Sequence, residues 1–332
     1  MKRYPVFDLH CDLLSYLASR PNSNPSDADD IGCAIPFLQR GRVRWQVLAI
    51  YSGTEKGSAH MAGEQVNAYR RLINNYGDVF TPVTSLDDAN ALTAGSKIGV
   101  TVSIENASGL CEEDETLERA FERLENIIEA TGRVIYIGLT HHGENRFGGG
   151  NTTTAGLKDD GKALLEYLNG RKIAIDLAHT SDALAHGILD YLTKKSLDVP
   201  VIASHSNFRQ VFEHPRNLPE ELVKEVISRK GLIGMNFLRA YVNNDDPDAL
   251  RQHILHGFNH GAKNAIAFGA DYFYTKDHPD PTRIPFYFPE HASAERYPNV
   301  LESLQGDLSD KQLTDLAFGN VLQFVNRVWN EG

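Results

Sequence analysis

Short apolar runs rich in β-branched residues recur along the chain, and polar stretches of helical length separate most of them. Runs of this kind, bounded by turn-forming residues, are typical of buried strands. Eight are present: VFDLH, VRWQVLAIY, IGVTVSIEN, RVIYIGLTHH, KIAIDLAH, VPVIASHS, GLIGMNF and AIAFGADY. The pattern therefore predicts eight strands distributed over nearly the whole chain.

The stretches between these runs place polar and apolar residues at helical spacing. The expected helices are Ala59 to Tyr76, Glu115 to Thr131, Ala155 to Asn169, Ser181 to Lys194, Pro219 to Arg229 and Asp248 to His260. Strands that alternate with helices indicate parallel strands joined by helical crossovers. Eight such units predict an α/β fold, the (β/α)8 or TIM barrel, with its active site at the C-terminal ends of the strands.

No low-complexity linker interrupts the sequence, so we expect a single barrel domain over residues 1–332. The segment from about 272 to 298 is rich in Pro, Tyr and Phe and follows the eighth strand. We expect it to form a long loop. Loops of this length are uncommon in compact domains, and they are usually functional or disordered.

Composition narrows the class of partner. The formal net charge is −11, with no basic cluster, which argues against a nucleic-acid surface. No segment reaches the roughly 18 consecutive apolar residues of a membrane span, and the first residues lack the apolar stretch of a signal peptide. The three cysteines, Cys11, Cys33 and Cys111, are too scattered for a disulfide framework or a zinc motif. We therefore expect a cytoplasmic protein with a small-molecule partner and neither a nucleic-acid nor a membrane partner.

Histidines and acids collect where the expected strands end. They are His10 and Asp12 on the first strand, Glu105 on the third, His141 and His142 on the fourth, His179 on the fifth, His205 on the sixth and Asp271 on the eighth. Each residue alone is more often a hydrogen-bonded structural residue than a ligand. Together they would bring several charges to one rim of the barrel, where burial is costly unless the charges are paired or bind a metal.

The residue types at this rim suit a metal site. His10 and Asp12 lie two positions apart, so both point to one face of a strand and offer a nitrogen and a carboxylate oxygen to an ion such as Zn²⁺. His179 and His205 end adjacent strands, and Glu105 has two oxygens that could bridge two ions. A catalytic zinc typically keeps about three protein ligands, so five favour a two-metal site. Such a site activates water, which indicates hydrolysis.

At these positions the sequence resembles the membrane (renal) dipeptidases, zinc peptidases built on the metal-dependent amidohydrolase barrel. The matching stretches, in chain order, are Asp8-Leu9-His10-Cys11-Asp12, Glu105 in VSIEN, Leu139-Thr140-His141, Asp176 to His179, Ser204 to Ser206, Arg216-Asn217-Leu218-Pro219, Asn236-Phe237 with Tyr241, Phe268-Gly269-Ala270-Asp271, and Gly319 to Leu322. Each fragment is weak by itself. Their order and spacing over nearly the whole chain are highly specific.

The resemblance implies two Zn²⁺ ions per chain with Glu105 as the bridging ligand. His10 and Asp12 would complete one zinc site, and His179 and His205 the other. A bridging hydroxide would attack the peptide carbonyl of a dipeptide that has a free C-terminal carboxylate on an L- or D-residue. The family resemblance also implies a homodimer.

The resemblance assigns roles to the other rim residues. His141 would stabilise the oxyanion, and Asp271 would move a proton to the departing amine. Arg216 would bind the terminal carboxylate, because a planar guanidinium can donate two parallel hydrogen bonds to it. Arg209 lies only seven residues earlier, and physical reasoning from the sequence alone does not separate the two arginines. Tyr241 would also contact the substrate.

Some positions depart from the family pattern. Leu9 replaces a common Gly, and Asn106-Ala107 follow Glu105 where animal members often have Gly-Gly. Tyr272-Phe273-Tyr274 and the proline-rich segment after them also differ. Loops beyond the strand ends shape the pocket, so the alternative of another amide substrate, an N-acyl amino acid or a cyclic amide, stays open.

Two further histidine features have plainer interpretations. His253, His256 and His260 form a stripe on an expected helix of the outer ring, which favours a packing or solvated role over a metal site. Strand alternation would point His142 away from His141, and the family pattern selects His141.

Overall fold

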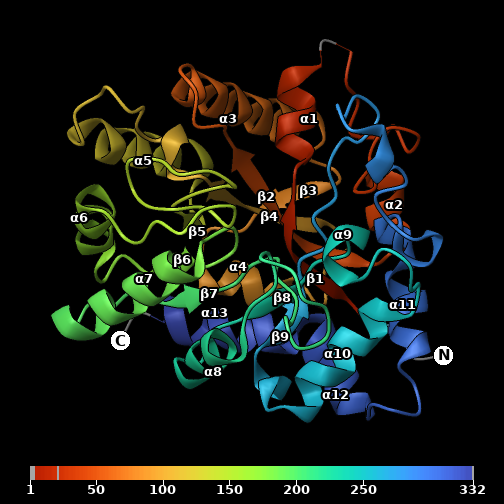
Figure 1. Ribbon diagram of the computed structural model, residues 1–332. Coiled ribbons are helices and arrows are strands. Elements are labelled where there is room, and N and C mark those ends of the chain that lie inside the picture. The colour runs from red at the N-terminus through yellow and green to blue at the C-terminus, as the bar shows by residue number, and fades with distance from the viewer. Residues whose placement is uncertain (1–3, 21, 331–332) are drawn as a thin grey trace.

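Eight parallel strands form a barrel inside a ring of helices in the computed structural model, which describes residues 4–20 and 22–330 (Figure 1). The barrel strands are β1 (Val6–Cys11), β2 (Val43–Tyr51), β4 (Ile98–Glu105), β5 (Val134–Gly138), β6 (Ala174–Asp176), β7 (Val201–Ile202), β8 (Ile233–Met235) and β9 (Ile266–Phe268). The strands pair in the order β7, β6, β5, β4, β2, β1, β9, β8. A parallel bridge between Ala203 and Ile233 joins the two ends of this sheet. The predicted (β/α)8 barrel is confirmed.

The strands coincide with the predicted apolar runs to within one residue or lie inside them, and several are shorter than those runs. Strand β7 has only two residues, and β6, β8 and β9 have three each. The polar residues that end these runs therefore lie in loops that leave the barrel. The sequence did not predict the short strand β3 (Phe80–Pro82), which pairs with β4 outside the barrel path.

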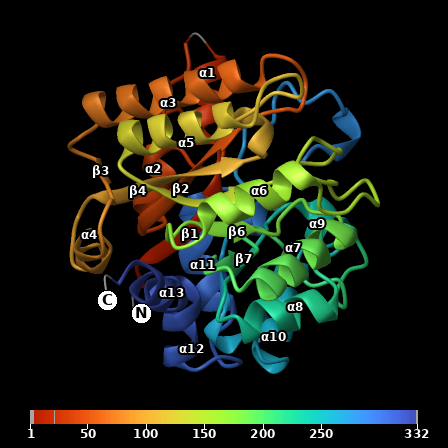
Figure 2. The same cartoon turned by 90° about the vertical axis from the view of Figure 1, so that its left-hand side faces the viewer.

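Helices cover the outer face of the barrel (Figure 2). Six match predicted helices to within a few residues: α3 (Ser58–Asn75), α5 (Glu118–Thr131), α6 (Asp159–Leu168), α7 (Asp182–Lys195), α8 (Glu220–Ser228) and α10 (Ala249–Asn259). The others were not predicted: α1 (Leu13–Ser19), α2 (Ile35–Arg40), α4 (Leu86–Ala91), α9 (Arg239–Val242), α11 (Tyr297–Ser303), α12 (Asp310–Thr314) and α13 (Asn320–Trp329). Among the described residues, no helix is both long and apolar enough to cross a lipid bilayer.

Strand β4 shows how residue alternation builds the barrel. Val100, Val102 and Ile104 pack in the core between the strands and the helices. The residues between them face the barrel interior, where the Thr101 hydroxyl accepts a hydrogen bond of 3.0 Å from the Trp45 indole. The residues that face the interior follow at every second position, and the last of them is Glu105, at the end of the strand.

The C-terminal helix α13 closes one end of the barrel. Phe324, Val325 and Trp329 belong to the same buried cluster as Phe7 and Trp45, which lie near the beginnings of β1 and β2. The rings of Trp45 and Trp329 are 5.6 Å apart. The amphipathic helix therefore shields the N-terminal ends of the strands from water, and the opposite end holds the cavity described below.

The segment that follows β9 runs from residue 272 to 296 without a long helix, close to the predicted loop of 272–298. It contains three single-turn 3-10 helices: η3 (Pro281–Arg283), η4 (Pro289–His291) and η5 (Ala294–Arg296). Tyr272, Phe286 and Tyr287 are buried, so the aromatic residues of this loop pack onto the protein.

Candidate metal centre and active site

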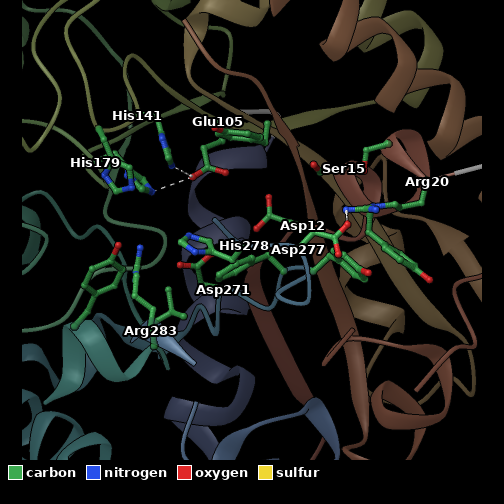
Figure 3. Close-up of a pocket in the computed structure, with 18 residues that line it drawn as sticks. Asp12, Ser15, Arg20, Glu105, His141, His179, Asp271, Asp277, His278 and Arg283 are labelled. Carbon is green, nitrogen blue, oxygen red and sulfur yellow. Dashed lines mark ion pairs between the residues drawn. The ribbon is translucent and has the colours of Figure 1, made fainter. Parts of the chain in front are cut away.

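A cavity of about 370 Å³ opens at the C-terminal ends of the barrel strands (Figure 3). This volume lies within the range of small-molecule sites. Seven of the predicted rim residues line it: Asp12, Glu105, His141, His142, His179, Tyr241 and Asp271. His10, His205 and Arg216 are also at this end of the barrel but are almost fully buried. The structure thus brings together all the side chains that the sequence placed at the rim.

Four of these side chains lie in loops rather than in strands. His141, His179, His205 and Asp271 each stand three residues beyond the last residue of β5, β6, β7 and β9. The backbone turns sharply at two of them, with φ of 63° at His179 and 65° at Asp271. Left-handed φ values are costly for residues other than glycine and cluster at functional sites.

Glu105 is the centre of the arrangement. Its Oε2 lies 3.3 Å from His10 Nε2, and its Oε1 lies 3.0 Å from His179 Nε2 and 3.6 Å from His205 Nε2. Asp12 Oδ2 is 3.8 Å from His10 Nε2. The two carboxylate oxygens therefore face two different groups of ligand atoms, with His10 and Asp12 on one side and the two other imidazoles on the opposite side.

A hydrogen-bond chain orients His10. Its Nδ1 lies 2.8 Å from the hydroxyl of Tyr136, and that hydroxyl donates to the Leu9 carbonyl at 2.8 Å. The tyrosine proton is thus already used in the bond to Leu9, so His10 Nδ1 must donate to the tyrosine oxygen. His10 Nε2 is left facing the cavity, buried and without a hydrogen-bond partner among the described residues. Metal-binding histidines are typically held in this way through their second ring nitrogen.

A second chain orients His205. The Ser204 hydroxyl donates to Asp176 Oδ2 at 2.5 Å and lies 2.7 Å from His205 Nδ1, which therefore donates to it. Burial, reinforced by the charge of His10, holds the pKa of His205 well below its usual range. Its Nε2 is buried and without a hydrogen-bond partner in the described chain. The nitrogen thus presents an unshared lone pair to Glu105.

His179 also offers an unprotonated nitrogen. Its Nε2 lies 3.2 Å from Arg216 Nη2, and because a guanidinium only donates, this nitrogen must accept. Burial and the charge of Arg216 hold the pKa of His179 well below its usual range. The same Nε2 is the atom 3.0 Å from the Glu105 carboxylate. Two lone-pair atoms at this distance repel each other unless a cation lies between or beside them.

The pKa values of the buried side chains also indicate that the site lacks positive charge. Burial raises the pKa of Asp12 well above its usual range, and the charge of Glu105 raises it further. The pKa of His10 is also well above its usual range, because Tyr136 and Glu105 outweigh the opposing effect of burial. Divalent cations would satisfy these groups. Imidazole nitrogens and carboxylate oxygens are the donor set that zinc prefers, so the residues present fit the metals that the sequence predicts.

Asp271 lies beside the proposed ligands. Its Oδ1 is 3.7 Å from His10 Nε2, and its Oδ2 accepts a hydrogen bond of 2.8 Å from the Asn236 side chain. Burial raises the pKa of Asp271 to about 6.

Two other groups of potential ligands overlap the centre, namely His10 with His205 and Asp271, and His141 with His142 and His179.

The structure corrects the prediction for His142. Its ring centroid is only 4.1 Å from that of His141, and both rings line the cavity. Strand alternation does not apply because β5 ends at Gly138, before either histidine. His142 Nδ1 bonds to Asn151 Oδ1 at 2.9 Å.

Burial lowers the pKa of His141 to about 3, so its imidazole is neutral near pH 7.

The two arginines that the sequence could not distinguish have different surroundings. Arg209 makes two hydrogen bonds of 2.6 and 2.8 Å to the Asp182 carboxylate. Arg216 is 3% exposed, bonds to Ser206 and to the His205 carbonyl, and has no acid within 4.0 Å in the described part of the chain. Its Nε has no hydrogen-bond partner there. Arg209 is therefore an internally satisfied ion pair, whereas Arg216 is a buried cation that lacks an anion.

Tyr241 connects Arg216 to the cavity. The guanidinium carbon of Arg216 is 5.2 Å from the centroid of the Tyr241 ring, within cation–π range. Tyr241 lies in the short helix α9 and lines the cavity. Arg216 itself is not among the residues that line the cavity.

The sequence reasoning missed several residues of this site. Tyr136 carries the only hydroxyl in β5 and gives no signal in an otherwise apolar run. Asp176 and Ser204 stand in stretches that the family resemblance singled out, but their contact with His205 depends on the pairing of β6 with β7. Their polar character inside otherwise apolar runs is the signal that could have found them.

Comparison with known proteins agrees with this geometry. The sequence profile of the membrane dipeptidase family, peptidase family M19, matches residues 1–331. An uncharacterized dipeptidase of Schizosaccharomyces pombe is 30% identical over 206 residues. That match covers 59% of this chain and 46% of the yeast protein, so it spans about half of the curated relative.

Solved structures share the fold. A metallopeptidase from Rhodobacter sphaeroides, liganded with a phosphinate mimic of the dipeptide L-Ala-D-Ala, has a TM-score of 0.82 and 16% identity, over 99% of this chain and 100% of that chain. A probable dipeptidase from Pseudomonas aeruginosa has a TM-score of 0.81 and 16% identity, over 98% and 96% of the two chains. The family profile, which extends over nearly every residue, shows more than the fold: the chain belongs to the membrane dipeptidase family, peptidase family M19.

Proposed function

We propose that the protein is a dinuclear zinc dipeptidase that hydrolyses dipeptides with a free C-terminal carboxylate. One observation carries the proposal: three imidazole Nε2 atoms lie 3.0 to 3.6 Å from the two oxygens of Glu105 at the floor of a small cavity. Membership of the membrane dipeptidase family supports the reaction class. The yeast relative is described as a dipeptidase, which supports it further.

Five residues would hold the two ions. His10 and Asp12 would bind one ion, His179 and His205 the other, and Glu105 would give one oxygen to each. The separate partners of Glu105 Oε2 and Oε1 support this division. Bound as a pair, the cations would lower the pKa of a water molecule between them and supply the attacking hydroxide near pH 7.

His141 and Asp271 would assist the bond cleavage. His141 Nε2 lies 3.8 Å from Glu105 Oε1, and its ring packs edge-on against Tyr51 at 5.0 Å, which fixes its orientation in the cavity. A neutral imidazole N–H there would donate to the oxyanion that forms on the scissile carbonyl. Asp271, held by Asn236 on the His10 side, would carry a proton to the departing amine.

Arg216 would bind the terminal carboxylate. A buried guanidinium with no acid beside it is unfavourable unless an anion arrives from outside. The guanidinium lies 5.2 Å from the ring of Tyr241 and 3.2 Å from His179 Nε2, and both of these residues line the cavity. A substrate without a free carboxylate would leave Arg216 unpaired, which supports selection against amidated or esterified substrates.

Hydrolysis assays on the zinc-loaded protein test the reaction class. We expect about two zinc ions per chain and hydrolysis of simple dipeptides such as Ala-Ala, with much slower hydrolysis of the amidated form Ala-Ala-NH₂. N-acyl amino acids and cyclic amides form the comparison panel. Faster hydrolysis of that panel than of any dipeptide, or no bound zinc, would contradict the proposal.

Substitution of the two arginines tests the carboxylate site. We expect Arg216→Met to lower kcat/KM for Ala-Ala at least about 100-fold, because it removes a charge-assisted bidentate contact. Arg209→Met is the matched control, since it deletes the same group seven residues away and should keep most of the activity. Equal losses in the two variants would show that the effect comes from folding rather than from carboxylate binding.

A further inference from the structure

The cavity contains charged side chains beyond those of the metal centre. Arg20, Asp277 and Arg283 all line it, and all lie outside the barrel strands. Arg20 forms an ion pair with Asp277, and its guanidinium lies 4.5 Å from the centroid of the Tyr274 ring. The charges at that end of the cavity therefore neutralise each other.

Arg283 has no such partner. It is partly exposed, lines the cavity, and has no acid within 4.0 Å in residues 4–20 and 22–330. The nearby Asp280 accepts hydrogen bonds from the backbone and the hydroxyl of Thr282 instead. The Arg283 guanidinium lies 5.3 Å from the centroid of the Phe286 ring, which leaves its N–H groups free to donate.

The loop that carries Arg283 is anchored by contacts with two other segments. Arg239, on α9, donates from its backbone to the Phe286 carbonyl at 2.9 Å and from its side chain to the Pro285 carbonyl at 2.9 Å. The Tyr287 hydroxyl donates to the Asp271 carbonyl at 2.5 Å. Residues 285–287 are thus tied to the barrel, and Arg283 sits just before this tie. A cation held in this way is already placed to meet a ligand.

Arg283 lies on the Arg216 side of the cavity. Figure 3 shows it below His179 and His141, with Arg20 and Ser15 on the opposite side. Arg216 Nη2 lies 3.2 Å from His179 Nε2, and Figure 3 draws Arg283 on this side of the cavity. Two cations on separate elements therefore act on the same region, the one where the C-terminal residue of a bound dipeptide would lie.

We propose that Arg283 binds the acidic side chain of the substrate's C-terminal residue, so that the enzyme prefers dipeptides ending in Asp or Glu. The inference rests on the proposed dipeptidase function. Arg216 would take the terminal carboxylate, and Arg283 a second carboxylate on the same side of the cavity. A guanidinium forms strong charge-assisted hydrogen bonds with carboxylates. A neutral side chain in the same position would cover Arg283 without replacing its lost water contacts, and a cationic one would be repelled.

Matched substrates and variants test the preference. The zinc-loaded full-length enzyme is assayed with Ala-Asp against Ala-Asn and with Ala-Glu against Ala-Gln, pairs that differ in charge but hardly in shape. We expect the ratio of kcat/KM values, acidic over neutral, to exceed 10 in the wild type and to fall about 10- to 100-fold in Arg283→Gln. In Arg283→Glu we expect Ala-Lys to become a better substrate than Ala-Asp.

Lys276→Gln is the control variant. It removes a positive charge from the same loop, but Lys276 pairs with Asp30 and does not line the cavity, so the acidic-to-neutral ratio should stay within about threefold of the wild type. An acidic-to-neutral ratio that stays unchanged in Arg283→Gln would overturn the inference. If kcat/KM also falls equally for both kinds of dipeptide, Arg283 is assigned to the shared terminal carboxylate instead. Failure of the wild type to hydrolyse any dipeptide would overturn the proposed function and this inference with it.

Discussion

Each histidine of the metal centre needs a defined tautomer, and for His10 that depends on a single hydroxyl. Tyr136 is fully buried, accepts from His10 Nδ1 and donates to the Leu9 carbonyl. Without the hydroxyl, the imidazole would have no acceptor for its Nδ1 proton. It could then rotate or place its proton on Nε2, the nitrogen that has to bind the metal.

We therefore expect Tyr136→Phe to weaken zinc binding about 10- to 100-fold, because outer partners of metal ligands typically have effects of this size. The ring is retained, so the barrel interior stays filled. Competition against a chromophoric zinc chelator measures the affinity without depending on catalysis.

Tyr69→Phe is the control for this substitution. Tyr69 is also buried, and its hydroxyl donates to the Thr131 carbonyl at 3.4 Å, away from the centre. If both variants bind zinc as the wild type does, Tyr136 has no part in holding the metal ligand.

At the scale of elements, helix α10 shows how one histidine of the predicted stripe packs. His253 is fully buried. Its Nδ1 accepts from the Phe208 backbone N–H at 3.2 Å, and its Nε2 donates to the Val242 carbonyl at 3.0 Å. The rings of His256 and His260 stack at 4.0 Å nearer the surface. The predicted packing role is confirmed for His253, which ties α10 to two neighbouring segments.

This packing makes the helix sensitive to acid. Burial lowers the pKa of His253 to about 4, against 6.5 for the ordinary side chain. Between these values the unfolded chain takes up a proton and the folded protein does not, so the free energy of unfolding falls as the pH falls from about 6.5 to 4. At about 1.4 kcal/mol per pH unit, this residue should account for a loss of about 2 to 3 kcal/mol between pH 7.5 and 4.5.

Urea unfolding of the wild type and of His253→Gln across this pH range measures the effect. The glutamine keeps a donor for the Val242 carbonyl but does not titrate. We expect the variant to be less stable at pH 7.5 and the difference to shrink or vanish at pH 4.5. A difference that stays constant with pH would mean that His253 is protonated to the same extent in both states.

At the scale of the whole molecule, the metal centre is also a stability element. Asp12, Glu105 and Asp271 gather their charges at one end of the barrel, where they are buried. Burial raises the pKa of Asp12 and of Asp271, and the charge of Glu105 raises both further, so keeping these two acids ionised opposes folding of the metal-free protein. Cations that bind only the folded state remove this cost.

We expect zinc to raise the melting temperature of chelator-treated protein by several degrees, because ligand at about 1,000 times Kd stabilises a folded protein by about 4 kcal/mol per site. Scanning calorimetry with and without zinc measures the shift. Glu105→Gln removes the bridging ligand and also the carboxylate that pairs with His10 in the metal-free protein, so we expect its metal-free form to melt lower than the metal-free wild type. Most of its zinc-dependent shift should be lost. A full shift in the variant would contradict the central place of Glu105.

The homodimer implied by the family resemblance stays a prediction, which light scattering of the zinc-loaded protein would check. Large apolar residues that are exposed in the described chain are few, Met61 and Ile284. A dimer interface would therefore have to be built largely from polar and partly buried residues.

Much of the fold was predictable from local pattern. Alternation along β4 puts Glu105 at the inner end of a buried strand, and polar residues can follow a strand only where it leaves the core. Helix α13 aside, the unpredicted elements were short: β3 has three residues and α9 has four, too few for a periodic signal. Helix α13 is amphipathic along its length, but its role in closing the barrel depends on Trp45 and Phe7, which are far away in the sequence.

The sequence by itself determined the eight strands, their parallel order and the set of histidines and acids at one rim, because strand period and the cost of burying charge act on each segment locally. Only the tertiary structure decided which way His142 points, which arginine lacks an anion, and that Tyr136 and Arg283 belong to the site. Those properties depend on contacts between residues from different segments, such as Asp182 with Arg209 and Leu9 with Tyr136. No pattern within one segment predicts such contacts.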